Sequence, residues 1–215
     1  MHPVSPETAL AQLRWRYAVK KFDPSKKIDS HTWAALEDSL VLAPSSYGLQ
    51  PWKFFVVEDA AVRQQLLPHS WGQAQIVEAS HLVVFAVKEN MNAADAERHV
   101  KRTSEVRGVP LASLEGYKGM MAGSLSRAMP EEVDVWMSRQ VFIAFGQFLA
   151  TCAMVGVDAC PMEGFVPAKY DEILGLTAKG YAARVVATVG YRHAEDKVAK
   201  LAKVRYPKDE VVERI

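Results

Sequence analysis

Short apolar segments rich in β-branched and aromatic residues punctuate the chain, and they predict strands. The clearest are residues 53–59 (KFFVVED), 80–89 (SHLVVFAVKE) and 181–193 (YAARVVATVGYRH). The second is a nearly continuous apolar run, which is typical of a strand covered on both faces. Residues 157–165 (VDACPMEGF) predict a further strand that ends in a turn.

Helical patterns separate these strands. Ser5 is a candidate N-cap for a helix over residues 6–15, and Asp29 or Ser30 caps a helix that runs to about Leu42, before Pro44. Further helices are expected over residues 60–70 and 167–176. Because strands alternate with helices, and neither a repeat nor a domain-scale linker occurs, the pattern predicts one mixed α/β sandwich.

The longest apolar run, residues 141–157 (VFIAFGQFLATCAMVGV), falls just short of a membrane span and carries Gln147 and Thr151. It predicts a helix over about residues 131–155, with Gly156 as a C-cap and burial on several sides. Two interpretations remain open. We favour a helix at a subunit interface over one that lies wholly within the core of its own chain.

Residues 90–131 are more polar. They predict two helices with breaks near residues 108–110 and at Pro130, which form an excursion, or lid, over a binding site. The last residues, about 194–215, predict an arm.

Composition excludes several classes of protein. The formal net charge is +1, so no general field attracts nucleic acid or an anionic membrane. Cys152 and Cys160 do not form a CxxC pair, and the N-terminus lacks the apolar core of a secretory signal. We therefore expect a cytoplasmic protein that binds neither nucleic acid nor membrane.

Common catalytic motifs are missing from the sequence. It contains no GxGxxG, no GxxxxGK[ST], no HExxH and no GxSxG. The histidines are scattered, so no metal site is expected. His81 lies within an apolar strand and is predicted to be a hydrogen-bonded core residue rather than a ligand.

Four cations occupy unusual places. Arg16 and Lys20 stand four residues apart in the predicted extended segment RWRYAVKKF. Lys203 and Arg205 stand two apart in KLAKVRYP, so both can face one side of an extended arm. Any one of them alone would be ordinary surface charge. Their combination with other segments indicates a site.

Five segments occur together in order: RWRYAVKKFD, APSSYGLQPWKFFVVED, EASHLVVFAVK, DACPMEGF and LAKVRYP. In this combination the chain resembles the FMN-dependent nitroreductase family, in particular oxygen-insensitive bacterial NAD(P)H nitroreductases and dihydropteridine reductase-like members. The resemblance runs from about residue 13 to 207. It implies that residues 1–215 form a single α+β domain, a three-layer sandwich with a central, mostly antiparallel sheet flanked by helices. It also implies a homodimer with a domain-swapped C-terminal arm and FMN in the subunit interface.

The resemblance assigns cofactor-binding roles. Arg16, Lys203 and Arg205 match the positions that bind the FMN phosphate, and Tyr17 and Ala18 would supply backbone contacts. Lys20 matches the lysine beside N1 and O2 of the flavin. The turn of Pro44, Ser45 and Ser46 would face the flavin that is bound mainly by the other subunit.

The remaining cofactor residues lie in two segments. Pro161 and Met162 would lie against the flavin ring, the backbone N–H of Glu163 would point at N5, and Gly164 would allow close approach. Gln73 and Gln75 would donate hydrogen bonds. Close relatives carry an asparagine and a second lysine where Gly72 and Gln75 stand, so one positive charge is missing. We predict a flavin potential more negative than in those relatives.

The implied activity is ping-pong hydride transfer from NADH or NADPH to a small acceptor, a nitroaromatic or a quinone. Catalytic roles fall on Glu163 and Lys20. Tyr47 stands where relatives commonly place a smaller, substrate-facing residue, and Tyr117 and Met121 of the lid are further substrate candidates. The alternatives are a reductive dehalogenase, an enone reductase, or a flavin-binding protein without turnover. The presence of Lys20 and of the PMEG turn argues against the last.

Overall fold

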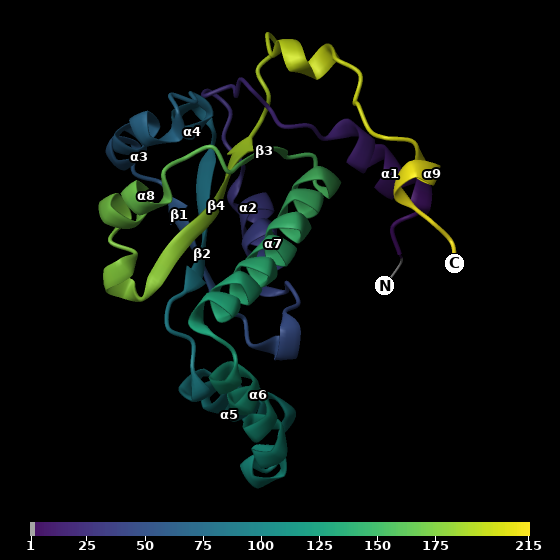
Figure 1. Cartoon of the computed structure of the whole chain (residues 1–215). Helices are drawn as coiled ribbons and strands as arrows, with labels where there is room; N and C mark the ends of the chain where they lie inside the picture. The colour runs from purple at the N-terminus through teal and green to yellow at the C-terminus, as the bar shows by residue number, and fades with distance from the viewer. Residues whose placement is uncertain (1–2) are drawn as a thin grey trace.

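A four-stranded antiparallel sheet forms the centre of the computed structural model, which describes residues 3–215; residues 1 and 2 of the predicted 1–215 domain lie outside this range (Figure 1). The strands lie in the order β1-β2-β4-β3. Their bounds are β1 Trp52–Val57, β2 His81–Lys88, β3 Asp158–Met162 and β4 Tyr181–Gly190. All four predicted strands are therefore confirmed, as is the antiparallel sheet.

Helices cover both faces of the sheet. Val83, Phe85 and Val87 of β2 point into a core shared with α2 (Ser30–Val41) and α7 (Pro130–Met154). The alternate residues of β2 point into a second core on the other face, which is covered by α3 (Ala60–Leu66), α4 (Gln75–Glu78) and α8 (Pro167–Leu174). Because β2 is buried on both faces, its sequence is apolar without alternation. The α+β three-layer sandwich is confirmed.

Helix ends follow the capping residues. Ser5 caps α1 (Pro6–Trp15), and Asp29 rather than Ser30 caps α2 by accepting a hydrogen bond from the Thr32 backbone N–H at 2.9 Å. Gly156 follows α7 in the left-handed conformation, with φ 73°. The helix expected over residues 60–70 is divided into α3 and a 3-10 turn, η2 (Leu67–Ser70), in which Pro68 has no N–H to donate.

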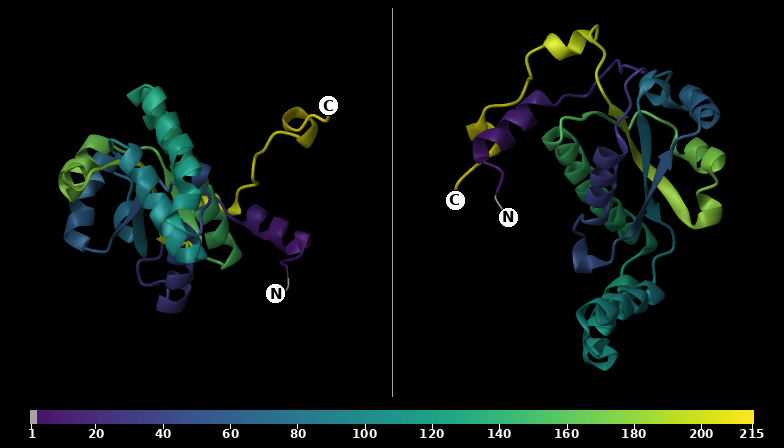
Figure 2. Two further views of the ribbon diagram at one scale, coloured as in Figure 1. Left: turned by 90° about the horizontal axis from the view of Figure 1, so that it is seen from below. Right: turned by 180° about the vertical axis from the view of Figure 1, so that it is seen from behind.

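Two segments project from the body. At one end, α5 (Ala93–Arg107), η3 (Leu111–Leu114) and α6 (Glu115–Arg127) form the predicted lid, which turns at Gly108 (Figure 1). Short 3-10 turns also precede two of the strands: η1 (Ser46–Gly48) comes before β1, and η4 (Thr177–Lys179) comes before β4. Away from the lid, α1 and the last residues, with η5 (Lys197–Lys200) and α9 (Lys208–Val211), extend away from the sheet (Figure 2).

The long helix α7 is buried only on the side that faces the sheet. Phe142 is 40% exposed and Ile143 is 46% exposed, although both are large and apolar. The expected burial on several sides is therefore not reached within one chain. Across residues 3–215, no helix combines the length and the apolarity that crossing a membrane requires.

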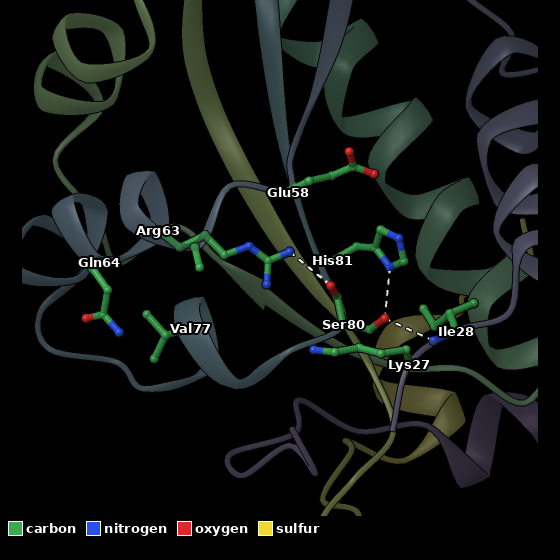
Figure 3. Close-up of a pocket in the computed structure, with 9 residues that line it drawn as sticks. Lys27, Ile28, Glu58, Arg63, Gln64, Val77, Ser80 and His81 are labelled. Carbon is green, nitrogen blue, oxygen red and sulfur yellow. Dashed lines mark hydrogen bonds between the residues drawn. The ribbon is translucent and has the colours of Figure 1, made fainter. Parts of the chain in front are cut away.

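Arg63 ties the helical layer to the sheet. It is buried, and its guanidinium donates hydrogen bonds to the carbonyls of Val57 (2.7 Å), Ala79 (2.7 Å) and Ser80 (3.0 Å), the last of which is drawn in Figure 3. These carbonyls belong to the end of β1 and the approach to β2. One side chain thus satisfies three backbone acceptors at the sheet end.

His81 lies beside this arginine. It is half-buried and hydrogen-bonds to the Ser80 hydroxyl at 3.0 Å (Figure 3). Its ring also stacks on Trp33, with ring centroids 3.8 Å apart. Burial and the nearby Arg63 charge lower its pKa to about 4, so the ring is neutral at pH 7. The predicted hydrogen bond is present, but His81 is only half-buried, so the prediction of a core residue holds only in part.

We predict that Arg63→Met lowers the free energy of unfolding by about 3 kcal/mol, because three buried carbonyls lose their donor. Urea denaturation followed by circular dichroism measures the change. Arg102→Met, on the exposed face of α5, is the matched control and should change stability by less than about 0.5 kcal/mol. Equal effects of the two substitutions would contradict this role for Arg63.

Candidate functional site

The extended segment that follows α1 lies along the edge strand β3. Ala18 pairs with Ala159 in a parallel bridge, and the backbone N–H of Val19 donates to the Ala159 carbonyl at 3.3 Å. This pairing brings Arg16 and Lys20 to the strand that ends in the PMEG turn. Segments far apart in the sequence therefore share one edge of the sheet.

The carboxylate of Asp196 holds this segment in place. Asp196 is 2% exposed and accepts hydrogen bonds from the Tyr17 hydroxyl (3.0 Å) and from the backbone N–H groups of Lys20 (2.8 Å), Lys21 (3.2 Å) and Val198 (2.9 Å). Burial alone would raise its pKa, but these hydrogen bonds outweigh burial and lower it. The same carboxylate thus fixes the extended segment and the start of the C-terminal arm.

A second buried carboxylate, that of Asp158, supports the same region through an ion pair. Asp158, at the start of β3, accepts two hydrogen bonds from Arg192 Nε, at 2.8 and 3.0 Å. The Arg192 guanidinium also lies over the rings of Trp15 (4.3 Å) and Tyr17 (4.5 Å). Sequence reasoning missed Asp158, Arg192 and Asp196. Their partners are distant along the chain, and nothing in the local sequence distinguishes them from surface charges.

Three of the predicted cations gather beside this scaffold. Lys203 Nζ donates to the carbonyls of Leu13, at 2.7 Å, and of Arg16. Burial and the neighbouring Arg205 lower the pKa of Arg16; burial, Arg16 and Arg205 lower the pKa of Lys203. Each cation therefore repels the others.

The Nε atom of Arg16 is buried and has no hydrogen-bond partner within residues 3–215. A buried, unpaired donor is costly unless a ligand satisfies it. Three converging cations and one orphaned donor fit a phosphate dianion, which carries about two negative charges at neutral pH.

The PMEG turn closes the other side of this edge. Pro161 and Met162 end β3, Glu163 is exposed, and the Gln73 side chain donates to the Gly164 carbonyl at 2.9 Å. A Cβ atom on Gly164 would lie 2.8 Å from ring carbons of Trp71, so a larger residue here would have to displace the exposed Trp71 side chain. Gln73 thus supports the turn from behind.

Trp71 is a further residue that sequence reasoning missed. It is 73% exposed, stands in the left-handed conformation with φ 55°, and covers Gly164. Its sequence signal is weak, because a Trp-Gly pair is an ordinary turn.

Gln75 and Lys20 both lie near Cys160. Burial raises the pKa of the Cys160 thiol, while the Lys20 charge and a hydrogen bond from Gln75 oppose that shift. Gln75 is itself buried, and Gly72 adopts φ 67° in the preceding turn. The structure therefore brings Lys20 and Gln75, a cation and a neutral amide, to the same part of the edge.

The turn of Pro44, Ser45 and Ser46, here called the serine turn, lies away from the cations. The backbone N–H of Ser46 donates to Gln140 of α7 at 2.9 Å, and the Ser45 hydroxyl accepts from the Gln50 N–H at 2.9 Å, while Pro44 is exposed. The Arg16 charge instead lies near Cys152, where it opposes the rise in the pKa of the thiol that burial causes. Cys152 follows Gln140 by twelve residues of α7, which is about 18 Å along the helix. Within one chain the serine turn and the cations are therefore not brought together.

The two predicted substrate residues of the lid lie in different environments. The Tyr117 hydroxyl donates to the Tyr47 carbonyl at 2.9 Å, and the two rings meet edge to face. Met121 is fully buried and packs in the core, so it offers no surface to an acceptor; this corrects its prediction as a substrate residue. Its neighbour Met120 points outward. In residues 3–215 no group of three or more His, Cys, Asp or Glu side chains could hold a metal ion.

Comparison with known proteins identifies the family and the fold. A model of the nitroreductase family matches residues 13–191. The chain belongs to the nitroreductase family. It is 34% identical over 198 residues, 88% of each chain, to a Staphylococcus aureus protein whose name assigns it provisionally to the NAD(P)H nitroreductases.

Solved structures share the nitroreductase fold. A provisionally assigned nitroreductase of Bacillus subtilis superposes with a TM-score of 0.85 at 19% identity, over 96% of this chain and 98% of that one. A provisionally assigned nitroreductase of Exiguobacterium sibiricum, in complex with FMN, superposes with a TM-score of 0.81 at 16% identity, over 100% and 99% of the two chains.

We predict that Asp196→Asn lowers the free energy of unfolding by about 2 kcal/mol at pH 7, because four donors lose a charged acceptor. The folded-state pKa of Asp196 is lowered, so its contribution is present above about pH 4, the usual aspartate value, and is lost as the pH falls through the folded-state pKa.

Urea denaturation at pH 7 and pH 3 checks both statements. The difference between the wild type and Asp196→Asn should shrink at the lower pH. Asp209→Asn, in the exposed arm, is the control and should have little effect at either pH. A difference that stays constant with pH would contradict the role of the charge.

Proposed function

We propose that this nitroreductase-family protein is an FMN-dependent NAD(P)H oxidoreductase that reduces small acceptors, nitroaromatics or quinones, in two separate half-reactions. One observation carries the proposal. The buried, unpaired Nε of Arg16 lies among three mutually repelling cations, on the same edge as Lys20 and the PMEG turn. The name of the staphylococcal relative and the FMN-bound structure of the Exiguobacterium neighbour support the choice of nucleotide and cofactor.

When bound, FMN would supply hydride-transfer chemistry at its N5 atom. Arg16, Lys203 and Arg205 would hold its phosphate by charge-assisted hydrogen bonds, next to the backbone of Tyr17 and Ala18. Lys20, whose side chain has no ion pair among the described residues, would face the pyrimidine edge and stabilise negative charge that develops on reduction.

The PMEG turn would position the reacting face. Pro161 and Met162 would pack against the flavin ring, and Glu163 would contribute its backbone N–H toward N5. Gly164 and its support by Gln73 would keep that backbone close and rigid. The chain would thus bind and orient the cofactor, and protons could come from solvent.

We further propose a homodimer, in which the turn of Pro44, Ser45 and Ser46 serves the partner's cofactor. Three features support it. The serine turn lies about 18 Å along α7 from the cations of its own chain. Helix α1 buries no side chain, and Phe142 and Ile143 of α7 are exposed. We keep the cytoplasm as the expected location, since Cys152 and Cys160 are both buried free thiols.

The first experiment is the visible spectrum of the purified protein, followed by anaerobic addition of NADH or NADPH. The flavin bands should bleach and then recover when a nitroaromatic or a quinone is added. Recovery with a halogenated aromatic or an enone alone would favour those alternatives. Bleaching without recovery by any acceptor would favour a flavin-binding protein without turnover.

Arg16→Ala tests the observation that carries the proposal. It should weaken FMN binding by roughly tenfold to hundredfold, because a charge-assisted hydrogen bond to phosphate contributes about 1.5–3 kcal/mol. Fluorescence titration of the apoprotein with FMN measures the affinity. Arg14→Ala, on the exposed face of α1, is the control. A protein that takes up no FMN at all would refute the proposed function.

Gln75→Lys tests whether the missing positive charge lowers the potential of the flavin. A cation at this position should stabilise the reduced flavin and raise its midpoint potential, because negative charge develops beside it. Anaerobic dye-equilibration titration measures the potential. Gln65→Lys on the exposed side of α3 should leave it unchanged. A potential that falls or stays constant in Gln75→Lys would contradict the assignment.

A further inference from the structure

Tyr47, directly after the serine turn, is held in an unusual conformation. Its φ is 59°, in the left-handed region that residues with a side chain rarely adopt. The Tyr117 hydroxyl of α6 donates to its carbonyl at 2.9 Å. The Tyr47 hydroxyl reaches toward Ser124, also on α6, at 3.4 Å. The lid therefore contacts both the backbone and the side chain of this residue.

The other lid helix holds the next residue. A Cβ atom on Gly48 would lie 2.9 Å from Cε1 of His99, on α5, and Gly48 has φ 73°. His99 in turn meets the Tyr117 ring edge to face, with centroids 6.3 Å apart. Helix α6 thus holds Tyr47 by hydrogen bonds, and His99 of α5 packs closely beside Gly48.

Tyr47 forms one wall of a cavity of about 270 Å³ between this turn, α6 and α7. Its volume is near the lower end for small-molecule sites, which corresponds to one or two fused rings. Most of its walls are apolar or aromatic; they include Leu49, Leu125, Val133 and Trp136. Such a lining suits a flat, apolar molecule.

We propose that Tyr117 is a positioning residue that sets acceptor specificity. Through the Tyr47 carbonyl it fixes the Tyr47 ring as a wall, so the cavity admits flat one- or two-ring acceptors and excludes larger ones. This inference rests on the proposed function, because it takes the acceptor to approach the cofactor beside the serine turn. Tyr117 itself need not touch the acceptor.

Tyr117→Phe tests this, since it removes the hydroxyl and keeps the ring. The two half-reactions are followed separately by stopped-flow absorbance on the FMN-loaded protein. The probes are 1,4-benzoquinone, with one ring, and 9,10-phenanthrenequinone, with three. In Tyr117→Phe the ratio of kcat/KM for the three-ring quinone to that for the one-ring quinone should rise by roughly threefold to tenfold. The change should appear mainly in the KM for the quinone, and reduction of the flavin by NAD(P)H is measured in the same variant to show that the protein is folded and loaded.

Two further variants complete the test. Tyr181→Phe, which removes a hydroxyl outside the lid and the turn, is the matched control and should keep the wild-type ratio. Tyr47→Ala removes the wall itself and should raise the ratio at least as much as Tyr117→Phe. An unchanged ratio in Tyr47→Ala or in a folded Tyr117→Phe, with flavin reduction intact, would overturn the inference. Absence of flavin reduction in the wild type would instead be a failure of the proposed function, and the inference would fall with it.

Discussion

The Asp196 carboxylate is the constraint on which the candidate site depends. It is almost fully buried, and it joins the extended segment after α1 to the first turn of the C-terminal arm. It adds to the other bonds between these two segments, such as the one from the Lys203 Nζ to the Leu13 carbonyl, and it is the most buried of them. Because a buried carboxylate must be fully hydrogen-bonded to stay charged, its four donors can occupy only a narrow range of positions. That rigidity places Arg16, Lys20 and Lys203 relative to one another.

At the candidate site, buried charges and donors are not matched with partners as they usually are in a folded protein. Elsewhere, buried charges have hydrogen-bond partners: Asp158 is satisfied by the Arg192 cation, and Asp196 is satisfied by four donors. Around Arg16, like charges gather and a buried donor stays unpaired. A fold tolerates such an arrangement when a ligand supplies the missing charge, which is why the cation cluster carries more functional information than any single motif. The length of α7 separates this cluster from the serine turn of the same chain.

Most of the elements were predictable, and the misses have physical causes. Strands and caps depend on local patterns, and α2, β2 and α7 lie where those patterns predict them. Residues 60–70 were predicted as one helix because periodicity does not register the missing N–H of Pro68. Met121 was named as a substrate candidate because adjacent residues of a helix point about 100° apart, and the sequence does not say which member of the Met120–Met121 pair faces the core.

By itself, the sequence determined what depends on neighbouring residues: the strands, the helix caps, the near-neutral charge and the order of segments that marks the family. It also supplied the cations, since their types and spacings are read directly from the chain. Tertiary structure decided which distant groups meet. The Asp196 and Asp158 networks, the burial of Arg16 Nε and the contact of Tyr117 with Tyr47 all join residues separated by many positions. Such contacts are set by packing across the sheet, which no local pattern encodes.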